Sequence, residues 1–198
     1  FIQQWSGINT IIYYAPTILK QAGFSDNLGA IYATTGIGIV NFLMTFVAIY
    51  LTDRVGRKPL LYVGLTGVGL CLILLALSFS NIEFLGEYSK YFALVSTILY
   101  IMFFAFSLGP IMFVISTEVS PLRIRGVMMS IAMMSNFAFN FMVSLSFLPM
   151  LKAFGEFNTF MLFAVISFIS IIFVRFVIPE TKGKSLEEIE RNWIKGNV

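Results

Sequence analysis

Long apolar stretches, separated by short polar connectors, recur along the whole chain. Each is close to the roughly 20 residues that a helix needs to cross the about 30 Å of hydrocarbon in a bilayer. Apolar and polar residues do not alternate as they would in strands, so the stretches are predicted to be helices. We therefore expect an all-α membrane bundle of six transmembrane helices, at residues 3–23, 28–51, 60–80, 91–115, 126–150 and 157–178.

The six predicted helices divide into two sets of three, at residues 3–80 and 91–178, joined by the connector 81–90. Because each set has an odd number of spans, the second is expected to be inverted relative to the first. The first helix of each set carries residues that weaken the helical ladder, Ser6-Gly7 and Gly109-Pro110. Singly, such residues serve close packing or a simple kink equally well. Their matching positions in two repeats favour interrupted helices beside a transport site near the middle of the membrane.

Uncharged amide side chains interrupt three of the apolar stretches, at Gln3, Gln4, Asn9, Asn41, Asn136 and Asn140. Burying an amide without a hydrogen-bond partner costs about 2–7 kcal/mol, so each needs a partner in the protein, in water or in a ligand. In a straight helix, at about 100° per residue, Gln3, Gln4 and Asn9 cannot all point at one ligand. A helix loosened around Gly7 could bring them together, and this is the physical use that we assign to the glycine.

No Asp, Glu, Lys, Arg or His falls near the centre of a predicted span, although charges there are expected on an ion or proton pathway. Amides offer donors and acceptors without charge, which suits a neutral ligand that carries many hydroxyl groups. Aromatic side chains such as Tyr13, Tyr14, Phe113 and Phe137 could cover the C–H face of such a ligand. The alternative is that the rings fill space between helices and that the amides join helices by hydrogen bonds of about 0.6 kcal/mol each.

The composition agrees with a membrane protein, since 58% of the 198 residues are hydrophobic, 12% are charged and the mean hydropathy is +0.89. Of the 13 Lys and Arg residues, ten fall on one side of the predicted membrane. The positive-inside rule makes this side cytoplasmic, so both ends of the chain are expected in the cytoplasm. The net charge of +3 is then a topology signal, and no nucleic-acid partner is expected.

Acidic residues accompany basic residues at three predicted cytoplasmic helix ends, in DRVGRK (53–58), EVSPLRIRG (118–126) and PETKG (179–183). The acids could pair with bases of neighbouring helices, and the candidate charge network comprises Asp53, Arg57, Lys58, Glu118, Arg125 and Glu180. Such pairs either hold the cytoplasmic side shut and break on opening, or only mark topology, with surface pairs worth roughly 0–1 kcal/mol each. The sequence favours neither interpretation.

The chain is expected to divide into a membrane domain at 1–178 and a cytoplasmic tail at 179–198. In the tail, Ser185 and Glu188 form a capping box for a short amphipathic helix. The single cysteine, Cys71, excludes an intrachain disulfide. The chain does not begin with Met, which indicates a piece of a longer protein. With no His, no cluster of metal ligands and no nucleophile constellation, we expect no cofactor, no metal and no enzyme.

Four linked motifs together resemble one family. QQWSGINTIIYY (3–14), DRVGRK (53–58), GPIMF (109–113) followed by STEVSPLRIRG (116–126), and PETKG (179–183) look like the C-terminal half of a major facilitator superfamily sugar porter. The resemblance covers all 198 residues. It implies a twelve-helix transporter, of which helices seven to twelve are present here and an N-terminal six-helix half is missing.

The resemblance also implies roles for particular residues. It assigns sugar binding to Gln3, Gln4, Asn9, Asn41, Phe113, Asn136 and Phe137. It assigns the outer gate to Tyr13 and Tyr14, and the inner charge network to the six charged residues named above. Many relatives have Trp where this chain has Phe113 and Phe137, and some proton-coupled relatives have Gln in place of Asn136. These departures leave the identity of the sugar open.

By this resemblance, the whole protein is expected to transport a hexose or a pentose by alternating access, as a facilitator or a proton symporter of the plasma or inner membrane. Its expected partners are the monosaccharide, membrane lipid and the missing half. Two rival functions stay open. One is transport of another neutral polyol such as inositol, and the other is a sensor that binds sugar without moving it.

Overall fold

The structure of the chain, a computed structural model, describes residues 1–21, 27–80, 88–183 and 188. These residues form helices and no strands, which confirms the predicted all-α fold class for the part that is described. The helices are α1 (Ile2–Trp5), α2 (Ile8–Gln21), α3 (Asn27–Val55), α4 (Arg57–Ser78), α5 (Ser89–Phe106), α6 (Leu108–Val119) and α7 (Arg125–Val177). Of the short helix predicted in the tail, only Glu188 is among the described residues.

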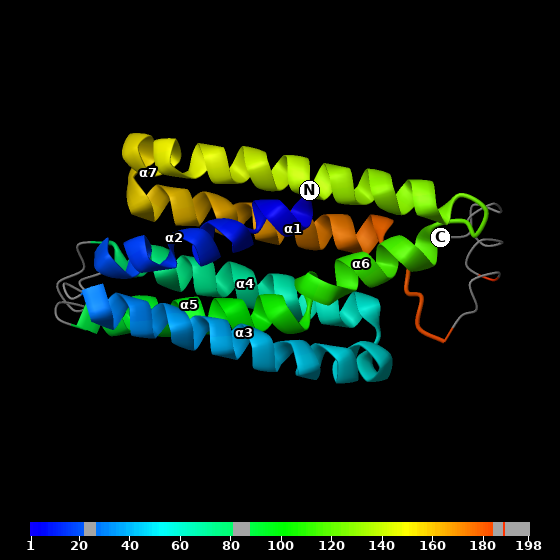
Figure 1. The fold of residues 1–198 in the computed structure, drawn as a ribbon, viewed down its shortest axis with the longest axis horizontal. Helices are drawn as coiled ribbons and strands as arrows, with labels where there is room; N and C mark the ends of the chain where they lie inside the picture. The colour runs from blue at the N-terminus through cyan, green and yellow to red at the C-terminus, as the bar shows by residue number, and fades with distance from the viewer. Residues whose placement is uncertain (22–26, 81–87, 184–187, 189–198) are drawn as a thin grey trace.

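The helices run along a common direction and form one bundle (Figure 1). Four stretches are long and apolar enough to cross a membrane, namely Ile31–Thr52, Arg57–Ser78, Ser89–Val119 and Arg125–Val177. The last of these, α7, doubles back at Gly155, whose φ of 76° and ψ of 169° are not helical (Figure 1). We call residues 125–154 the first arm and residues 156–177 the second arm of α7. The six-span count and the inverted repeats stay predictions.

The first predicted span is broken between α1 and α2, at the place that the sequence indicated. Gly7 has a φ of 88°, a left-handed conformation that glycine adopts without steric cost. Its carbonyl accepts the first hydrogen bond of α2, from the Ile11 N–H at 2.9 Å. The angle between side chains before and after Gly7 is therefore no longer fixed at about 100° per residue, as it would be in a straight helix.

The second break lies at Ser107 and not at Gly109-Pro110, where the sequence placed it. Ser107 separates α5 from α6 and has a φ of −124° and a ψ of −89°. Pro110 is the third residue of α6, where a backbone N–H has no acceptor within the helix, so the donor that proline lacks is not missed. The glycine and proline therefore begin the second segment, and the break falls immediately before them.

The predicted connector 52–59 is almost entirely helical. α3 extends to Val55 and α4 begins at Arg57, so Gly56 alone separates the two helices. Gly56 has a φ of 103°, and a Cβ at this position would lie 3.0 Å from the Glu180 carboxylate. The chain reverses within one residue because glycine tolerates this conformation and leaves room for the carboxylate.

α4 is the most buried of the four candidate spans, with 61% of its most apolar stretch buried, compared with 11% for that of α3. Two of its glycines allow α5 and α6 to approach closely. A Cβ would lie 2.0 Å from the Ser107 Oγ at Gly64 and 2.2 Å from the Phe103 ring at Gly67. Small residues are a common means by which membrane helices pack at short distance.

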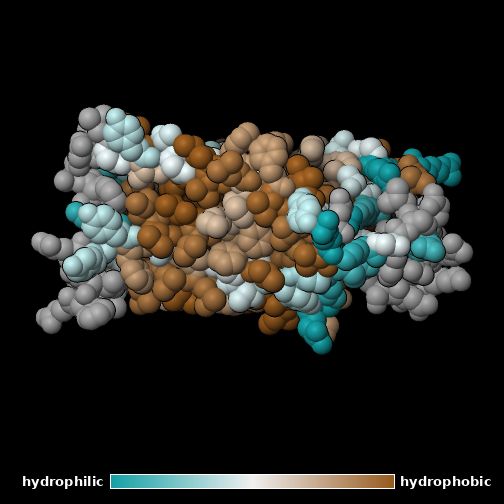
Figure 2. All heavy atoms as spheres, turned by 90° about the horizontal axis from the view of Figure 1, so that it is seen from below, coloured by the Kyte–Doolittle hydropathy of each residue, from teal (hydrophilic) through white to brown (hydrophobic). Residues whose placement is uncertain are grey.

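The outer surface carries a wide hydrophobic band, with hydrophilic side chains gathered most strongly toward one end of the face seen in Figure 2. Large apolar side chains such as Phe42, Phe46 and Phe176 are more than half exposed. A soluble protein rarely exposes so extensive an apolar surface. The band is therefore consistent with the membrane class that the composition predicted.

Candidate functional site

Four of the five predicted substrate-binding amides form a continuous series of hydrogen bonds across the break between α1 and α2. Asn9 Nδ2 donates to Gln4 Oε1 at 2.7 Å, and Gln4 Nε2 donates to Asn136 Oδ1 at 2.8 Å. Asn136 Nδ2 donates in turn to Gln3 Oε1 at 2.6 Å. We call these four residues the amide chain. It joins α1, α2 and the first arm of α7.

Gln3 anchors the amide chain to the second break. Its Nε2 donates to the carbonyl oxygens of Leu108 at 3.1 Å and Gly109 at 3.2 Å, in the first turn of α6 after Ser107. Gln3 and Gln4 are 7% and 5% exposed, so these hydrogen bonds satisfy polar groups that have little access to water. The amide chain therefore connects the two helix breaks.

The amide chain uses only part of its hydrogen-bonding capacity. Each side-chain amide has two N–H donors and two acceptor lone pairs. Asn9 Oδ1 accepts no hydrogen bond among the described residues. A hydroxylated ligand could bind the unused positions or replace amide–amide bonds. The same geometry also fits the alternative in which the amides only join helices.

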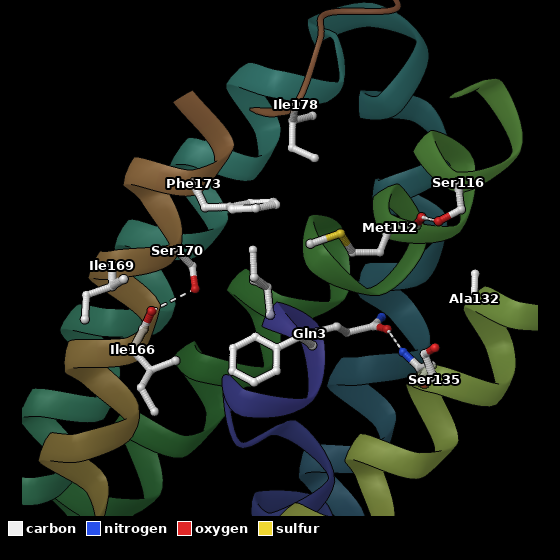
Figure 3. A pocket seen from close by; sticks show the side chains of 13 residues that line it. Gln3, Met112, Ser116, Ala132, Ser135, Ile166, Ile169, Ser170, Phe173 and Ile178 are labelled. Carbon is white, nitrogen blue, oxygen red and sulfur yellow. Dashed lines mark hydrogen bonds between the residues drawn. The ribbon is translucent and has the colours of Figure 1, made fainter. Parts of the chain in front are cut away.

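A cavity of about 630 Å³ lies beside the amide chain, between α1, α6 and both arms of α7 (Figure 3). Gln3 and Asn136 stand on one of its walls. Two hydroxyls on the wall, Ser116 and Ser170, each donate at 2.7 Å to a carbonyl of their own helix. Most other lining side chains are apolar, as Phe173 is. The cavity thus presents polar groups mainly where it meets the amide chain.

The other predicted substrate-binding residues lie outside the amide chain. Phe113 lines a smaller cavity of about 40 Å³ together with Gln3 and Asn136. Phe137 is 68% exposed on the first arm of α7. Asn41 is half-buried on α3, and in the described part of the chain it forms no hydrogen bond with the other amides. Of these three residues, only Phe113 shares one of the two cavities described here with members of the amide chain.

The two tyrosines predicted to form the outer gate occupy different environments on α2. Tyr13 is 57% exposed. Tyr14 is half-buried, and its ring centroid lies 5.1 Å from that of Phe147 on the first arm of α7. Successive residues point about 100° apart on a helix, so one tyrosine faces the core and the other the surface. Their role as a gate stays a prediction.

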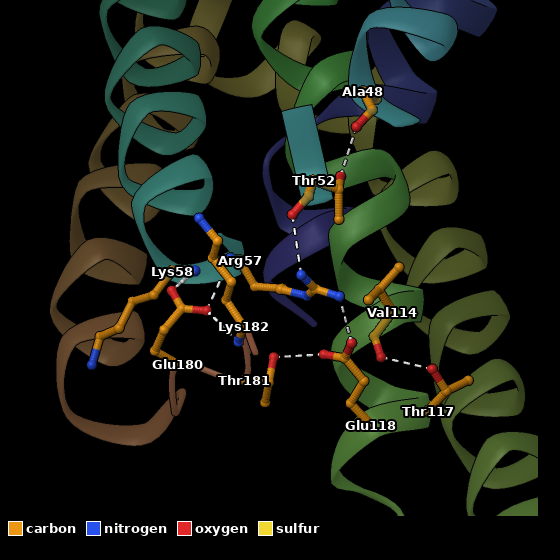
Figure 4. A network of polar contacts seen from close by, with 10 residues as sticks. All are labelled: Ala48, Thr52, Arg57, Lys58, Val114, Thr117, Glu118, Glu180, Thr181 and Lys182. Atoms are coloured by element: carbon orange, nitrogen blue, oxygen red, sulfur yellow. Dashed lines mark hydrogen bonds and ion pairs between the residues drawn. The ribbon is translucent and has the colours of Figure 1, made fainter. Parts of the chain in front are cut away.

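The predicted charge network contains one ion pair among the described residues, between Arg57 Nη2 and Glu118 Oε1 at 2.7 Å (Figure 4). Arg57 Nη1 also donates to the Thr52 carbonyl at 3.1 Å. The Thr181 hydroxyl donates to the other Glu118 oxygen at 2.5 Å. The two charged side chains are 13% and 17% exposed. This contact ties the end of α3, the start of α4, the end of α6 and the tail together.

Among the described residues, Glu180 pairs with no basic side chain and instead caps the start of α4. It accepts hydrogen bonds from the backbone N–H groups of Arg57 at 3.2 Å, Lys58 at 3.0 Å and Lys182 at 2.9 Å (Figure 4). Burial raises the pKa of Glu180, but hydrogen bonds from backbone N–H groups outweigh burial and hold the pKa below its ordinary value. The positive end of the α4 dipole also favours a carboxylate here.

The remaining members of the predicted network bind backbone carbonyls. Lys58 Nζ donates to the Arg175 carbonyl at 2.9 Å, and Arg125 Nη2 donates to the Ser120 carbonyl at 3.5 Å. Neither pairs with an acid in the part of the chain that is described. The Asp53 side chain lies outside the described residues. Among the side chains that the structure describes, the acid–base pairing suggested by the sequence is therefore found between Arg57 and Glu118.

We expect Glu180→Gln in the full-length protein to lower the free energy of unfolding by about 0.5–2 kcal/mol, as loss of a helix cap does. Because the pKa of Glu180 is lowered in the folded state, its contribution is present above the ordinary pKa of 4.5 and is lost as the pH falls through the lower folded-state pKa. Thermal unfolding of variant and wild type across pH measures this difference. Glu156→Gln on α7 is the control, and a difference that persists unchanged at strongly acidic pH contradicts the assignment.

Sequence reasoning missed Tyr100 of α5 as a residue that shapes the site. Its side chain is fully buried, and its hydroxyl donates to the Ser6 carbonyl at the first break, at 2.9 Å. A tyrosine within an apolar stretch belongs to no motif that points to a distant helix. The only available signal was that a buried phenol needs a hydrogen-bond partner.

Comparison with known proteins places the chain among transporters. A family model described as "Sugar (and other) transporter" matches residues 1–193. The chain is 40% identical over 193 residues to the D-xylose-proton symporter-like 3, chloroplastic, of Arabidopsis thaliana, which covers 98% of this chain and 34% of that protein. It is 36% identical over 195 residues to the galactose-proton symporter of Escherichia coli (strain K12), with 98% of this chain and 42% of that protein covered.

Solved structures give the same result. The proton:xylose symporter XylE of the major facilitator superfamily, bound to 6-bromo-6-deoxy-D-glucose, matches with a TM-score of 0.84 and 31% identity over 97% of this chain and 40% of that chain. An inward open conformation of the xylose transporter XylE from E. coli matches with a TM-score of 0.79, 32% identity and coverage of 96% and 39%. The chain thus spans less than half the length of these relatives.

Proposed function

The chain belongs to the sugar (and other) transporter family of the major facilitator superfamily, and from this premise we propose that it forms the C-terminal six-helix half of a monosaccharide transporter. The substrate that we propose is a hexose or a pentose, moved across the membrane by alternating access. The relatives reported above are transporters and not enzymes. The N-terminal half would complete both the site and the bundle, and both ends of this segment would face the cytoplasm.

The amide chain at the first helix break is the observation that carries the proposal. Buried carboxamides of α1 and half-buried carboxamides of α2 and α7 meet at distances of 2.6–2.8 Å where α1 and α2 separate. Within the described residues, no Asp, Glu, Lys or Arg side chain bonds to them. A neutral ligand rich in hydroxyl groups matches this set of donors and acceptors, whereas an ion does not.

Alternating access needs an element with two arrangements, and the cytoplasmic contact around Glu118 is suited to that role. The Arg57–Glu118 pair and the Thr181 hydroxyl connect α4, α6 and the tail. If α6 tilts about Ser107, Glu118 at its far end moves away from Arg57. We propose that this contact is intact when the cytoplasmic side is closed and separates when it opens.

The proposal includes two modes of energy coupling. Proton symport is the activity named for the galactose-proton symporter, whereas a facilitated trehalose transporter, Tret1 of Apis mellifera ligustica, is 37% identical to the chain. The amide chain itself contains no group that titrates near neutral pH. A proton-carrying acid, if the protein is a symporter, belongs to the N-terminal half.

A second substrate class, a neutral polyol such as inositol, is favoured by one relative. The chain is 39% identical over 190 residues to the probable polyol transporter 4 of Arabidopsis thaliana. A polyol presents the same hydroxyl groups to the amides as a sugar does. Phe113 and Phe137 provide no hydrogen-bond donor that would distinguish one ring from another.

Counterflow with the full-length protein in proteoliposomes tests the proposed function. We expect a preloaded monosaccharide to drive uptake of radiolabelled sugar, and we would compare glucose, xylose, galactose and inositol as competitors. Competition by inositol alone would transfer the assignment to polyols. Binding of sugar without counterflow would contradict transport and favour a sensor.

A further inference from the structure

The carbonyl oxygen of Ser6 lies at the first helix break and has left the helical ladder. In a continuous helix it would accept the Thr10 N–H, four residues ahead. In this structure that hydrogen bond is absent, and the Ser6 carbonyl accepts the Tyr100 hydroxyl of α5 at 2.9 Å. Tyr100 thus satisfies the backbone acceptor that the break releases.

Thr10, whose N–H the Ser6 carbonyl would accept in a continuous helix, has an unpaired hydroxyl. Its side chain is completely buried, yet its Oγ1 has no hydrogen-bond partner among the described residues. Threonines inside helices usually donate to the carbonyl four residues back, and others in this chain do so at 2.7–2.9 Å: Thr35, Thr45, Thr52, Thr97 and Thr159. For Thr10 that carbonyl is the one of Ser6, which at the break accepts the Tyr100 hydroxyl and neither the N–H nor the hydroxyl of Thr10.

We propose that the Ser6 carbonyl exchanges partners between Tyr100 and Thr10 as the break opens and closes. With α1 and α2 separated, Tyr100 donates to it and the Thr10 hydroxyl is left unpaired. With α1 and α2 joined into one helix, the Thr10 N–H and hydroxyl take the carbonyl and Tyr100 is released. The Ser6 carbonyl points either toward Tyr100 or along α2 toward Thr10, so each arrangement leaves one hydroxyl unpaired and the break has two discrete states. Tyr100 is then a positioning residue for the separated state.

The exchange controls whether the amide chain exists. Gln4 lies before the break and Asn9 after it, and their side chains are joined by a hydrogen bond of 2.7 Å. In one continuous helix, five residues at about 100° each would place the two side chains about 140° apart, so this bond could not persist. The separated state therefore assembles the amide chain, and the joined state takes it apart. The consequence for sugar binding rests on the proposed function, whereas the exchange of partners at the Ser6 carbonyl does not.

Hydrogen–deuterium exchange of the full-length protein without sugar tests the proposal. In the separated state the N–H groups of residues 8–10 begin α2 and lack helical acceptors, whereas in the joined helix they are bonded. We expect Tyr100→Phe to slow exchange at these amides about fivefold, the effect of one net hydrogen bond. We expect Thr10→Val to quicken exchange, because it removes the competing donor. The double variant should return to the wild-type rate.

Thr97→Val is the matched control, because it removes a buried hydroxyl from the same helix as Tyr100 but one that bonds within its own helix, to the Ala93 carbonyl. An unchanged rate in Tyr100→Phe, the same change in the control, or a double variant that exchanges at the rate of either single variant would overturn the proposal. If Tyr100→Phe does not fold, Thr10→Val decides alone by the sign of its effect.

Sugar affinity should fall about fivefold in Tyr100→Phe and recover in the double variant. If the wild-type protein binds no sugar, the proposed function is refuted, whereas the hydrogen–deuterium exchange measurement still tests the partner exchange of the Ser6 carbonyl.

Discussion

Replacing Gln4 with alanine is expected to reduce sugar counterflow by the full-length protein at least about tenfold. Gln4 stands in the middle of the amide chain, where it accepts from Asn9 and donates to Asn136. Its loss leaves two polar groups without partners, at a cost of about 1–3 kcal/mol each where they are buried. Since about 1.4 kcal/mol corresponds to tenfold in affinity, a sugar that depends on this arrangement should bind measurably more weakly.

Asn158→Ala is the control for this prediction. Asn158 is an exposed amide on the second arm of α7, and its Nδ2 donates to the Phe154 carbonyl of the same helix at 2.8 Å. Its removal should leave counterflow unchanged. Normal expression of Gln4→Ala with wild-type counterflow would exclude the amide chain from sugar binding and leave it the role of joining helices.

Gly64→Ala is expected to lower the free energy of unfolding by about 1–3 kcal/mol, the usual cost of overpacking a well-packed core. The added Cβ would lie 2.0 Å from the Oγ and 2.3 Å from the Cβ of Ser107. Rotation of the serine hydroxyl relieves only the first of these contacts, so α4 has to move away from the second break. Thermal unfolding of the purified full-length protein measures the loss.

Two further variants separate this clash from a general effect of helix glycines. Gly38→Ala on α3 adds a Cβ that meets nothing within 4 Å, so it should leave the unfolding temperature the same or slightly higher. Combining Gly64→Ala with Ser107→Gly removes both clashing atoms and should recover part of the loss. A drop of the same size in Gly38→Ala would mean that the contact with Ser107 is not the cause.

The helix breaks show how far local sequence determines this fold. Gly7 was predicted correctly because glycine is the residue that most readily adopts the positive φ at this break. The second break was misplaced by two residues, since Pro110 marks the start of a helix as readily as the end of one. Ser107 has no backbone preference that identifies it. What holds the break there is its hydroxyl on the Leu60 carbonyl, a contact between residues 47 positions apart.

The residues of the candidate site were predictable from the sequence, but their contacts were not. Burial of uncharged amides in apolar stretches was enough to select Gln3, Gln4, Asn9 and Asn136, because each requires a partner. Their order in the amide chain was not predictable, since it depends on the packing of α1 against α7. The same limit applies to Glu180, which was expected to pair with a base. Its actual partners are backbone N–H groups that become available only because α4 starts directly after Gly56.

The single-residue reversal at Gly56 has a mechanical consequence. Because a single residue joins them and the Glu180 carboxylate lies beside that residue, the joined ends of α3 and α4 cannot slide past each other or separate. Distances measured between probes on these two ends should stay constant through the proposed transport cycle. The junction therefore provides a fixed reference against which displacement of α1, α2 and α6 can be measured.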